Sequence, residues 1–331
     1  MPILPASPTD FNIIRSAYAE LTVTDLEASR AHYVDLLGLV ESARTEDALY
    51  LRALEERQHH CLVLRQAQRP AVNALGFKVS CEEDLGRLEA HFRRLGLPAV
   101  YVQKEFQGRT LRARDPQGMP LEFFHRMDPV ERMLQRFDLY RGAHVMRIDH
   151  LNCMVADVQA AHDFYARQLG FRVSEYTETD AADPQLWAAW MHRKGNVHDL
   201  ALMNGDGPRL HHVGMWVENG LDLIRICDIF AAAHLTDRLE RGPGRHGLSN
   251  AMFLYVRDPD GHRTELYTGD YQTMDPDFEP IRWSVNDVRR QTFWGHKAPE
   301  CWFLEASEFV WNGEPVPRQP ARLSERPAIA T

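Results

Sequence analysis

Apolar and polar positions repeat along this chain in two blocks of similar design. Residues 15–39 and 147–171 each begin with a short segment in which apolar and polar side chains alternate, continue with an amphipathic stretch, and reach a Leu-Gly pair. Alternation is typical of a half-buried strand, and apolar positions three and four residues apart are typical of a helix. Each block therefore predicts a strand and then a helix, with Gly38 or Gly170 in the C′ position.

The two predicted helices carry further signals of their own. Thr24 and Glu27 have the spacing of a capping box, in which two side chains satisfy free backbone N–H groups in the first helical turn. Tyr33 and Tyr165 stand at matching positions on the apolar faces of the two helices. The sequence thus predicts that the first helix begins at a Thr24 cap.

The repeat continues to the end of each block. Residues 59–64 match residues 197–202, and residues 115–124 match residues 258–267, where Asp-Pro-x-Gly turns feed strand-like segments. Further helices are predicted near 82–96 and 219–233. Each half therefore reads strand, helix and several strands, twice over.

This pattern predicts an α+β fold of tandem βαβββ modules, arranged as two domains with two modules each. The expected divisions are an N-terminal domain without a metal site at 1–140, a C-terminal domain with the site at 141–272, and a tail at 273–331. The tail is expected to pack on the body or near the active site.

Composition narrows the classes of function. The 331 residues carry a net charge of −9 without a block of Lys or Arg, which argues against a nucleic acid or an anionic membrane as partner. The five cysteines are scattered, so they predict neither a disulfide framework nor a CxxC metal clamp. The N-terminus lacks the pattern of a secretory signal, and no apolar run has the length of a membrane helix. A cytoplasmic location is expected.

The 16 histidines become informative when the two halves are compared. In the second half, the first predicted strand carries His150, a later strand carries His212, and the strand after the Asp-Pro turn carries Glu265. The first half has other residues at the equivalent positions, namely Tyr18, approximately Leu75 or Gly76, and Glu122. One half thus has a complete set of two histidines and a carboxylate, and the other half has lost it.

Two imidazoles and one carboxylate on one face of a metal leave open positions for other ligands. This set suits Fe(II) or Mn(II) that binds both a substrate and O2. A structural zinc site would instead fill its coordination sphere with four protein ligands, usually including cysteine. The sequence therefore predicts a catalytic Fe(II) or Mn(II) site, with one metal ion per chain.

Several motifs around these residues carry a family resemblance. RIDHLN at 147–152, GPRLHHVGMWV at 207–217, and the segments 188–202 and 240–267 resemble type I extradiol dioxygenases of the vicinal oxygen chelate superfamily. The resemblance is strongest to the homoprotocatechuate (3,4-dihydroxyphenylacetate) 2,3-dioxygenases and extends over about residues 15–300. It implies that O2 cleaves the ring of a catechol, giving a 2-hydroxymuconate semialdehyde, and that the chain forms a homo-oligomer, a tetramer in the family.

The resemblance also assigns roles to individual residues. His150, His212 and Glu265 match the metal ligands, His198 matches an acid/base histidine beside the O2 position, and Tyr255 matches a tyrosine that hydrogen-bonds the substrate oxygen. The residues matching the substrate pocket are Asn152, Trp190, His246, and Arg241, which faces the substrate carboxylate. A second arginine of the family falls at Arg290 or Arg289, although one alignment places Gln291 there.

Three other histidines receive structural interpretations. His211 is expected on the face of its strand opposite to His212. His60 parallels His198 in a half without ligands, which favours a relic or a surface role, and His262 is expected to be exposed in its turn.

Other functions stay open beside the cleavage of 3,4-dihydroxyphenylacetate. These are extradiol cleavage of another catechol, a glyoxalase-like metal-dependent isomerase or lyase, and a non-catalytic binding protein with the same fold.

Overall fold

The N-terminal half forms one eight-stranded sheet in the computed structural model, which describes residues 3–326. Its elements are β1 (Ile13–Val23), α1 (Leu26–Arg30) with a π-helical continuation (Ala31–Leu36), β2 (Val40–Arg44), β3 (Ala48–Arg52), β4 (Leu62–Gln66), β5 (Ala71–Val79), α2 (Glu83–Arg94), β6 (Ala99–Lys104), β7 (Gly108–Arg114) and β8 (Pro120–Phe124). The strand order is β2-β3-β4-β1-β5-β8-β7-β6. The first strands of two successive βαβββ modules, β1 and β5, therefore pair in the middle of the sheet.

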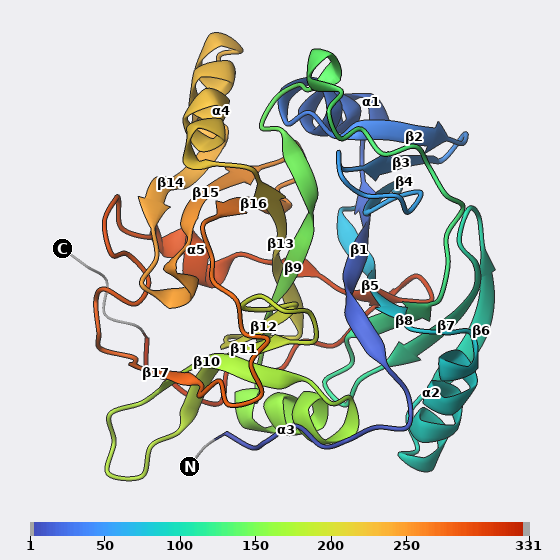
Figure 1. The fold of residues 1–331 in the computed structure, drawn as a ribbon. Coiled ribbons are helices and arrows are strands. Elements are labelled where there is room, and N and C mark those ends of the chain that lie inside the picture. The colour runs from blue at the N-terminus through green and yellow to red at the C-terminus, as the bar shows by residue number, and fades with distance from the viewer. Residues whose placement is uncertain (1–2, 327–331) are drawn as a thin grey trace.

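The C-terminal half repeats this arrangement. Its elements are β9 (Val145–Val155), α3 (Val158–Gln168), β10 (Arg172–Glu178), β11 (Leu186–His192), β12 (Leu200–Asn204), β13 (Arg209–Val217), α4 (Gly220–Ala232), β14 (Leu239–Arg245), β15 (Met252–Arg257) and β16 (Arg263–Thr268). The strand order is β14-β15-β16-β13-β9-β12-β11-β10. Short 3-10 turns lie at Phe137–Leu139, Thr236–Arg238 and Leu248–Asn250. The predicted α+β fold of tandem βαβββ modules is confirmed (Figure 1).

The tail extends the second sheet and lies against it. Strand β17 (Ile281–Ser284) pairs with β10, and β18 (Ser307–Glu308) pairs with β13. Between them lies α5 (Glu300–Leu304), and a two-stranded hairpin of β19 (Val310–Trp311) and β20 (Glu314–Pro315) follows. The domain boundaries at 140/141 and 272/273 stay a prediction. Within residues 3–326, no helix is long and apolar enough to cross a membrane.

The helix ends match the sequence analysis at most positions. Gly38 and Gly170 adopt positive φ angles of 86° and 70°, and the helices expected near 82–96 and 219–233 are α2 and α4. The predicted Thr24 cap is wrong, because Asp25 caps α1 by accepting hydrogen bonds from the backbone N–H groups of Glu27 and Ala28. The Thr24 hydroxyl instead donates to Asp260 of the other half, 2.6 Å away.

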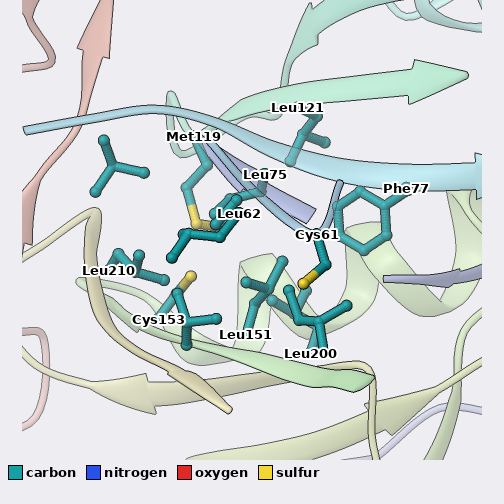
Figure 2. Packing of buried hydrophobic residues seen from close by; sticks show 14 of the residues in the cluster. Cys61, Leu62, Leu75, Phe77, Met119, Leu121, Leu151, Cys153, Leu200 and Leu210 are labelled. Atoms are coloured by element: carbon teal, nitrogen blue, oxygen red, sulfur yellow. The ribbon is translucent and has the colours of Figure 1, made fainter. Parts of the chain in front are cut away.

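One hydrophobic core runs through both halves of the molecule. In Figure 2, Leu62, Phe77 and Leu121 of the first half pack in the same cluster as Leu151 and Leu200 of the second half. Strands β1 and β9 lie next to each other where the halves meet (Figure 1). Burial of apolar surface therefore stabilises the two sheets together.

Two buried tyrosines make the same contact in opposite directions between the halves. The hydroxyl of Tyr33 donates to Asp258, and the hydroxyl of Tyr165 donates to Asp115, over 3.0 Å and 3.1 Å. Both aspartates begin the Asp-Pro-x-Gly turns of the repeat. Each half thus binds a helix tyrosine of the other half, and burial raises the pKa of Asp115 to about 7.

The histidine that ends the turn after Asp258 is also buried. The prediction that His262 is exposed is wrong, since its side chain is 3% exposed and its Nε2 lies 2.9 Å from the carbonyl oxygen of Thr22. This turn lies against the other half, a contact that the local sequence does not reveal.

Replacing Tyr165 with Phe tests the contact between the halves. We expect Tyr165→Phe to lower the free energy of unfolding by about 1–3 kcal/mol, because the buried Asp115 loses a hydrogen bond. Urea unfolding measures the change. Tyr101→Phe is the matched control, since the buried Tyr101 hydroxyl has no partner among residues 3–326. Equal effects of the two substitutions would contradict the assigned role of Tyr165.

Candidate active site

Strand register brings His150, His212 and Glu265 together. Strand β13 lies between β9 and β16, and its Gly214 is opposite His150 on one side and beside Glu265 on the other. The Nε2 atoms of His150 and His212 are 3.2 Å apart, and Oε2 of Glu265 lies 2.8 Å and 3.0 Å from them. All three side chains are buried. The residues predicted from the repeat therefore converge on one point.

Gly214 makes this geometry possible. Any Cβ at this position would overlap the ring of His150. The first half has the same device, because a Cβ at Gly76 would overlap the ring of Tyr18, which takes the place of His150. In both halves, the glycine on the neighbouring strand leaves the space that the aromatic ring occupies.

The trio sets a carboxylate against two imidazoles, and each group shifts the pKa of the others. Burial lowers the pKa of His150, but hydrogen bonds to Asp149 and Glu265 outweigh burial and raise it to about 9. Burial raises the pKa of Glu265, but His212 and His150 outweigh burial and hold it well below its usual range. Three ligand atoms thus face one another around a buried negative charge. Two imidazoles and a carboxylate fit Fe(II) or Mn(II), and these residues form the site that could hold the metal.

His211 does not lie where strand alternation places it. The register of β13 against β9 shifts between Leu210 and His212, as it does at a β-bulge. Nδ1 of His211 consequently lies 2.6 Å from Nδ1 of His212, and its Nε2 lies 2.7 Å from the carbonyl oxygen of Trp302. The expectation that His211 occupies the opposite face is therefore wrong, while its structural role is compatible with these contacts.

Two of the trio, His212 and Glu265, line a cavity that also gathers most of the other predicted site residues. Besides His212 and Glu265, its lining includes the predicted residues Asn152, Trp190, His198, His246, Tyr255 and Arg290. Gln291, the alternative position for the second arginine, lines it too. Its lining also includes residues that the sequence analysis did not single out, namely Trp187, Met203, Leu248, Ser249, Tyr267 and Trp302. The cavity therefore has aromatic walls and a few polar groups, as small-molecule sites commonly do.

His198 lies directly beside a metal ligand. Its ring centroid is 4.0 Å from that of His150, and its Nδ1 has no hydrogen-bond partner within residues 3–326. Burial, together with the nearby His150 and Lys194, lowers the pKa of His198 well below its ordinary value. The lowered pKa favours the neutral ring, and its buried Nδ1 has no hydrogen-bond partner among residues 3–326.

Tyr255 and His246 form a second polar group in the cavity. The hydroxyl of Tyr255 lies 3.1 Å from Nε2 of His246, and His246 stacks on Phe253 with ring centroids 3.9 Å apart. The backbone carbonyl of Gln291 contacts Nδ1 of His246. Because that carbonyl can only accept, Nδ1 carries the proton, and Nε2 can accept from Tyr255.

The two candidate arginines differ in their access to the cavity. Arg290 is 1% exposed, and its Nε and Nη2 have no hydrogen-bond partner in the described part of the chain. Burial, followed by the charge of Arg241, lowers the pKa of Arg290 to about 9. Arg289, by contrast, is exposed and pairs with Asp287 at 2.8 Å. Of the two adjacent arginines, Arg290 is the one that lines the cavity.

Arg241 lies behind the cavity wall. Its guanidinium carbon is 4.7 Å from the ring centroid of Phe253 and 4.8 Å from that of Trp302, and Nη2 donates to the carbonyl of Gln291. Nε and Nη1 of Arg241 are buried and lack partners among residues 3–326. Arg241 is not among the lining residues, so its predicted contact with a substrate carboxylate stays a prediction.

Simple signals point to some of the residues that the sequence analysis missed. Tyr267 follows Glu265 by two positions, so strand alternation places both side chains on one face. Asp149 precedes His150, and alternation wrongly suggests that the two side chains lie apart. Trp302 comes from α5 in the tail, and no local pattern connects it with the site.

The first half shows what replaced the metal site. Its register pairs Ala74 with Glu20, as His212 pairs with Asn152, so the counterpart of His212 is Ala74. The expected counterpart, Leu75 or Gly76, is therefore wrong by one or two residues. His60 is not on the surface either, since it is 1% exposed and packs against Tyr18.

A lysine supplies the positive charge in this half. Nζ of Lys104 lies 2.6 Å from carboxylate oxygens of both Glu20 and Glu122, and Tyr18 hydrogen-bonds to Glu122. Burial raises the pKa of Glu20, but Lys104 and Arg65 outweigh burial and hold it at about 2. An ammonium group therefore neutralises carboxylates at the position where the second half gathers metal ligands.

Removing this lysine is predicted to destabilise the fold. We expect Lys104→Met to lower the free energy of unfolding by about 3 kcal/mol, because two buried carboxylates lose their shared cation. Urea unfolding measures the effect. Lys78→Met is the control, since Lys78 faces the ring of Phe124 and forms no salt bridge within residues 3–326. An unchanged midpoint for Lys104→Met would show that these carboxylates do not depend on Lys104.

Comparisons with known proteins agree with this geometry. Residues 147–266 match the family model described as Glyoxalase/Bleomycin resistance protein/Dioxygenase superfamily. The chain therefore belongs to this superfamily, and within it to the extradiol dioxygenases, by its similarity to the following proteins.

Among the curated relatives, the manganese-dependent 2,3-dihydroxybiphenyl 1,2-dioxygenase of Geobacillus genomosp. 3 is 30% identical over 85% of this chain and 93% of its own. The metapyrocatechase of Pseudomonas sp. (strain CF600) is 30% identical over 85% and 94%. A solved structure of homoprotocatechuate 2,3-dioxygenase from Brevibacterium fuscum, an anaerobic complex with 3,4-dihydroxyphenylacetate, has a TM-score of 0.91. It is 44% identical and covers 95% of this chain and 98% of that chain.

Proposed function

We propose that this protein cleaves the ring of a catechol, specifically 3,4-dihydroxyphenylacetate, between a hydroxylated carbon and its unhydroxylated neighbour. Both atoms of O2 enter the product, a 2-hydroxymuconate semialdehyde. The cofactor is one Fe(II) or Mn(II) ion per chain, held by His150, His212 and Glu265. One observation carries the proposal: His212 and Glu265 of this buried trio line a cavity that is also lined by Arg290, a buried arginine with unpaired donors.

The charges of substrate and cavity complement each other. A bound metal supplies open coordination positions for the catechol and O2, and it lowers the pKa of the catechol hydroxyls. Arg290 offers its unpaired Nε and Nη2 to a carboxylate at the far end of the substrate. A catechol with an acidic side chain therefore satisfies groups at both ends of the cavity, which supports an arylacetate as substrate.

The remaining polar groups serve proton transfer and orientation. His198, beside His150, would accept a catechol proton and later donate it to an oxygen atom as the O–O bond breaks. Tyr255, whose hydroxyl lies 3.1 Å from Nε2 of His246, would turn its single O–H from His246 to a substrate oxygen as the ring carbonyl forms. Asn152 offers its unpaired Oδ1, and Trp190 forms part of the wall that excludes water.

The decisive experiment follows oxygen and colour together. Protein purified without air is analysed for metal, and 3,4-dihydroxyphenylacetate is then added with air. We expect one O2 consumed for each substrate and a yellow ring-opened product. His212→Ala, expected to fold but to lose the metal, is the control. A full metal site without oxygen uptake on any catechol would contradict the proposal and favour a glyoxalase-like reaction.

The role of His198 is tested by His198→Asn. We expect metal and substrate binding to persist while turnover falls about 10²- to 10⁴-fold, the usual contribution of a general acid/base. Stopped-flow absorbance separates substrate binding from product formation. His60→Asn changes the equivalent histidine of the first half and should leave turnover unchanged. Equal turnover of His198→Asn and the wild type would remove His198 from the mechanism.

Adjacent arginines give a matched test of substrate choice. We expect Arg290→Met to raise KM for 3,4-dihydroxyphenylacetate about 10- to 100-fold, because a charge-assisted hydrogen bond is lost. Unsubstituted catechol, which lacks the carboxylate, should be affected much less. Arg289→Met, at an exposed position, should change neither value. If both substrates respond equally to Arg290→Met, Arg290 shapes the cavity without recognising a carboxylate.

The assembly rests on the resemblance alone, and the location rests on the pattern of the N-terminus and of the apolar runs. A homotetramer in the cytoplasm is part of this proposal, and light scattering of the purified protein tests the assembly.

A further inference from the structure

The proposed mechanism does not use Asp149, although this residue contacts a metal ligand. Its side chain is fully buried, and Oδ2 lies 2.9 Å from Nδ1 of His150. Because a carboxylate accepts, Nδ1 of His150 donates to Asp149, and Nε2 points the other way, 2.8 Å from Glu265 at the metal position. Asp149 thereby determines which nitrogen of His150 points to the metal position.

The other side of Asp149 is held by the loop between β11 and β12. Oδ1 accepts a hydrogen bond from Asn196 over 2.9 Å, and Nζ of Lys194 lies 3.4 Å from it. Lys194 also donates to the backbone carbonyl of Asp149. The same loop carries His198, whose ring lies against that of His150. One segment therefore contacts both Asp149 and His150.

This loop is anchored by a second buried carboxylate. Oδ2 of Asp199 accepts from the backbone N–H groups of Arg193 and Lys194, over 2.6 Å and 3.0 Å. Oδ1 accepts from the backbone N–H of Ser16 in β1, over 2.7 Å, and the Ser16 hydroxyl donates to the carbonyl of Asp149. The N-terminal half, which lacks metal ligands, thus supports the metal site from behind.

We propose that Asp149 is a positioning residue for the metal, and that Asn196 and Lys194 hold it in place. The carboxylate fixes the tautomer and the orientation of His150 and makes Nε2 a stronger metal ligand. The loop therefore couples the placement of His198 to that of a metal ligand. This inference rests on the metal site of the proposed function.

Asp149→Asn is the most informative change. An amide can still accept from His150, but it lacks the charge, and its NH2 group would face the donors of Asn196 and Lys194. We expect Mn(II) affinity, measured by competition with a chelator, to fall about 10- to 100-fold, the usual effect of losing such a partner. The rise in Tm on adding Mn(II) should shrink accordingly.

Asp163→Asn is the matched control. Oδ1 of Asp163 lies 2.9 Å from Nδ1 of the preceding His162, on helix α3, which contributes no residue to the cavity lining. This variant should bind Mn(II) like the wild type. Asn196→Ala is a second variant in case Asp149→Asn does not fold, and it should weaken Mn(II) binding in the same direction without changing the charge.

The outcomes separate this inference from the proposed function. If the wild type binds no Mn(II) or Fe(II), the proposed function fails and the inference fails with it. If the wild type binds Mn(II) and Asp149→Asn or Asn196→Ala binds it equally well, only the positioning role is overturned. If Asp163→Asn lost as much Mn(II) affinity as Asp149→Asn, the loss would reflect general destabilisation. That result would also overturn the positioning role.

Discussion

Close pairing of β13 with β9 and β16 is the constraint on which the site depends. The three ligands come from strands that are far apart in the sequence, and hydrogen-bonded register sets their relative positions. Gly214 lets the ring of His150 cross β13, because a side chain there would occupy the same space. A bulge before His212 then brings His211 against it. The site is therefore a property of the sheet more than of any local motif.

The same scaffold carries different chemistry in the two halves. Tyr18, Ala74 and Glu122 occupy the positions of His150, His212 and Glu265, and a glycine lies under the ring in each half. A buried carboxylate that stays ionised needs a compensating charge or strong hydrogen bonds. Lys104 supplies positive charge in the first half, and the ligand set of the second half could hold a metal cation.

The half without ligands still supports the working site. Its core is continuous with that of the second half, and Tyr33 and Tyr165 bind aspartates across the junction in both directions. Ser16 reaches from β1 to the loop that carries His198. These contacts give a physical reason why one half with a site is joined to another half without one.

The sequence by itself determined the repeat, the modules and the ligand trio. Periodicity can be read within each segment, and the two halves can be compared residue by residue without knowing any contact. It also indicated His198 and Tyr255, through resemblance. Tertiary structure alone decided that Thr24 hydrogen-bonds to Asp260, that His262 is buried, and that Arg290 lines the cavity while Arg241 lies behind it. Each of these depends on contacts between segments distant in sequence, and neither alternation nor spacing along one segment carries information about such contacts.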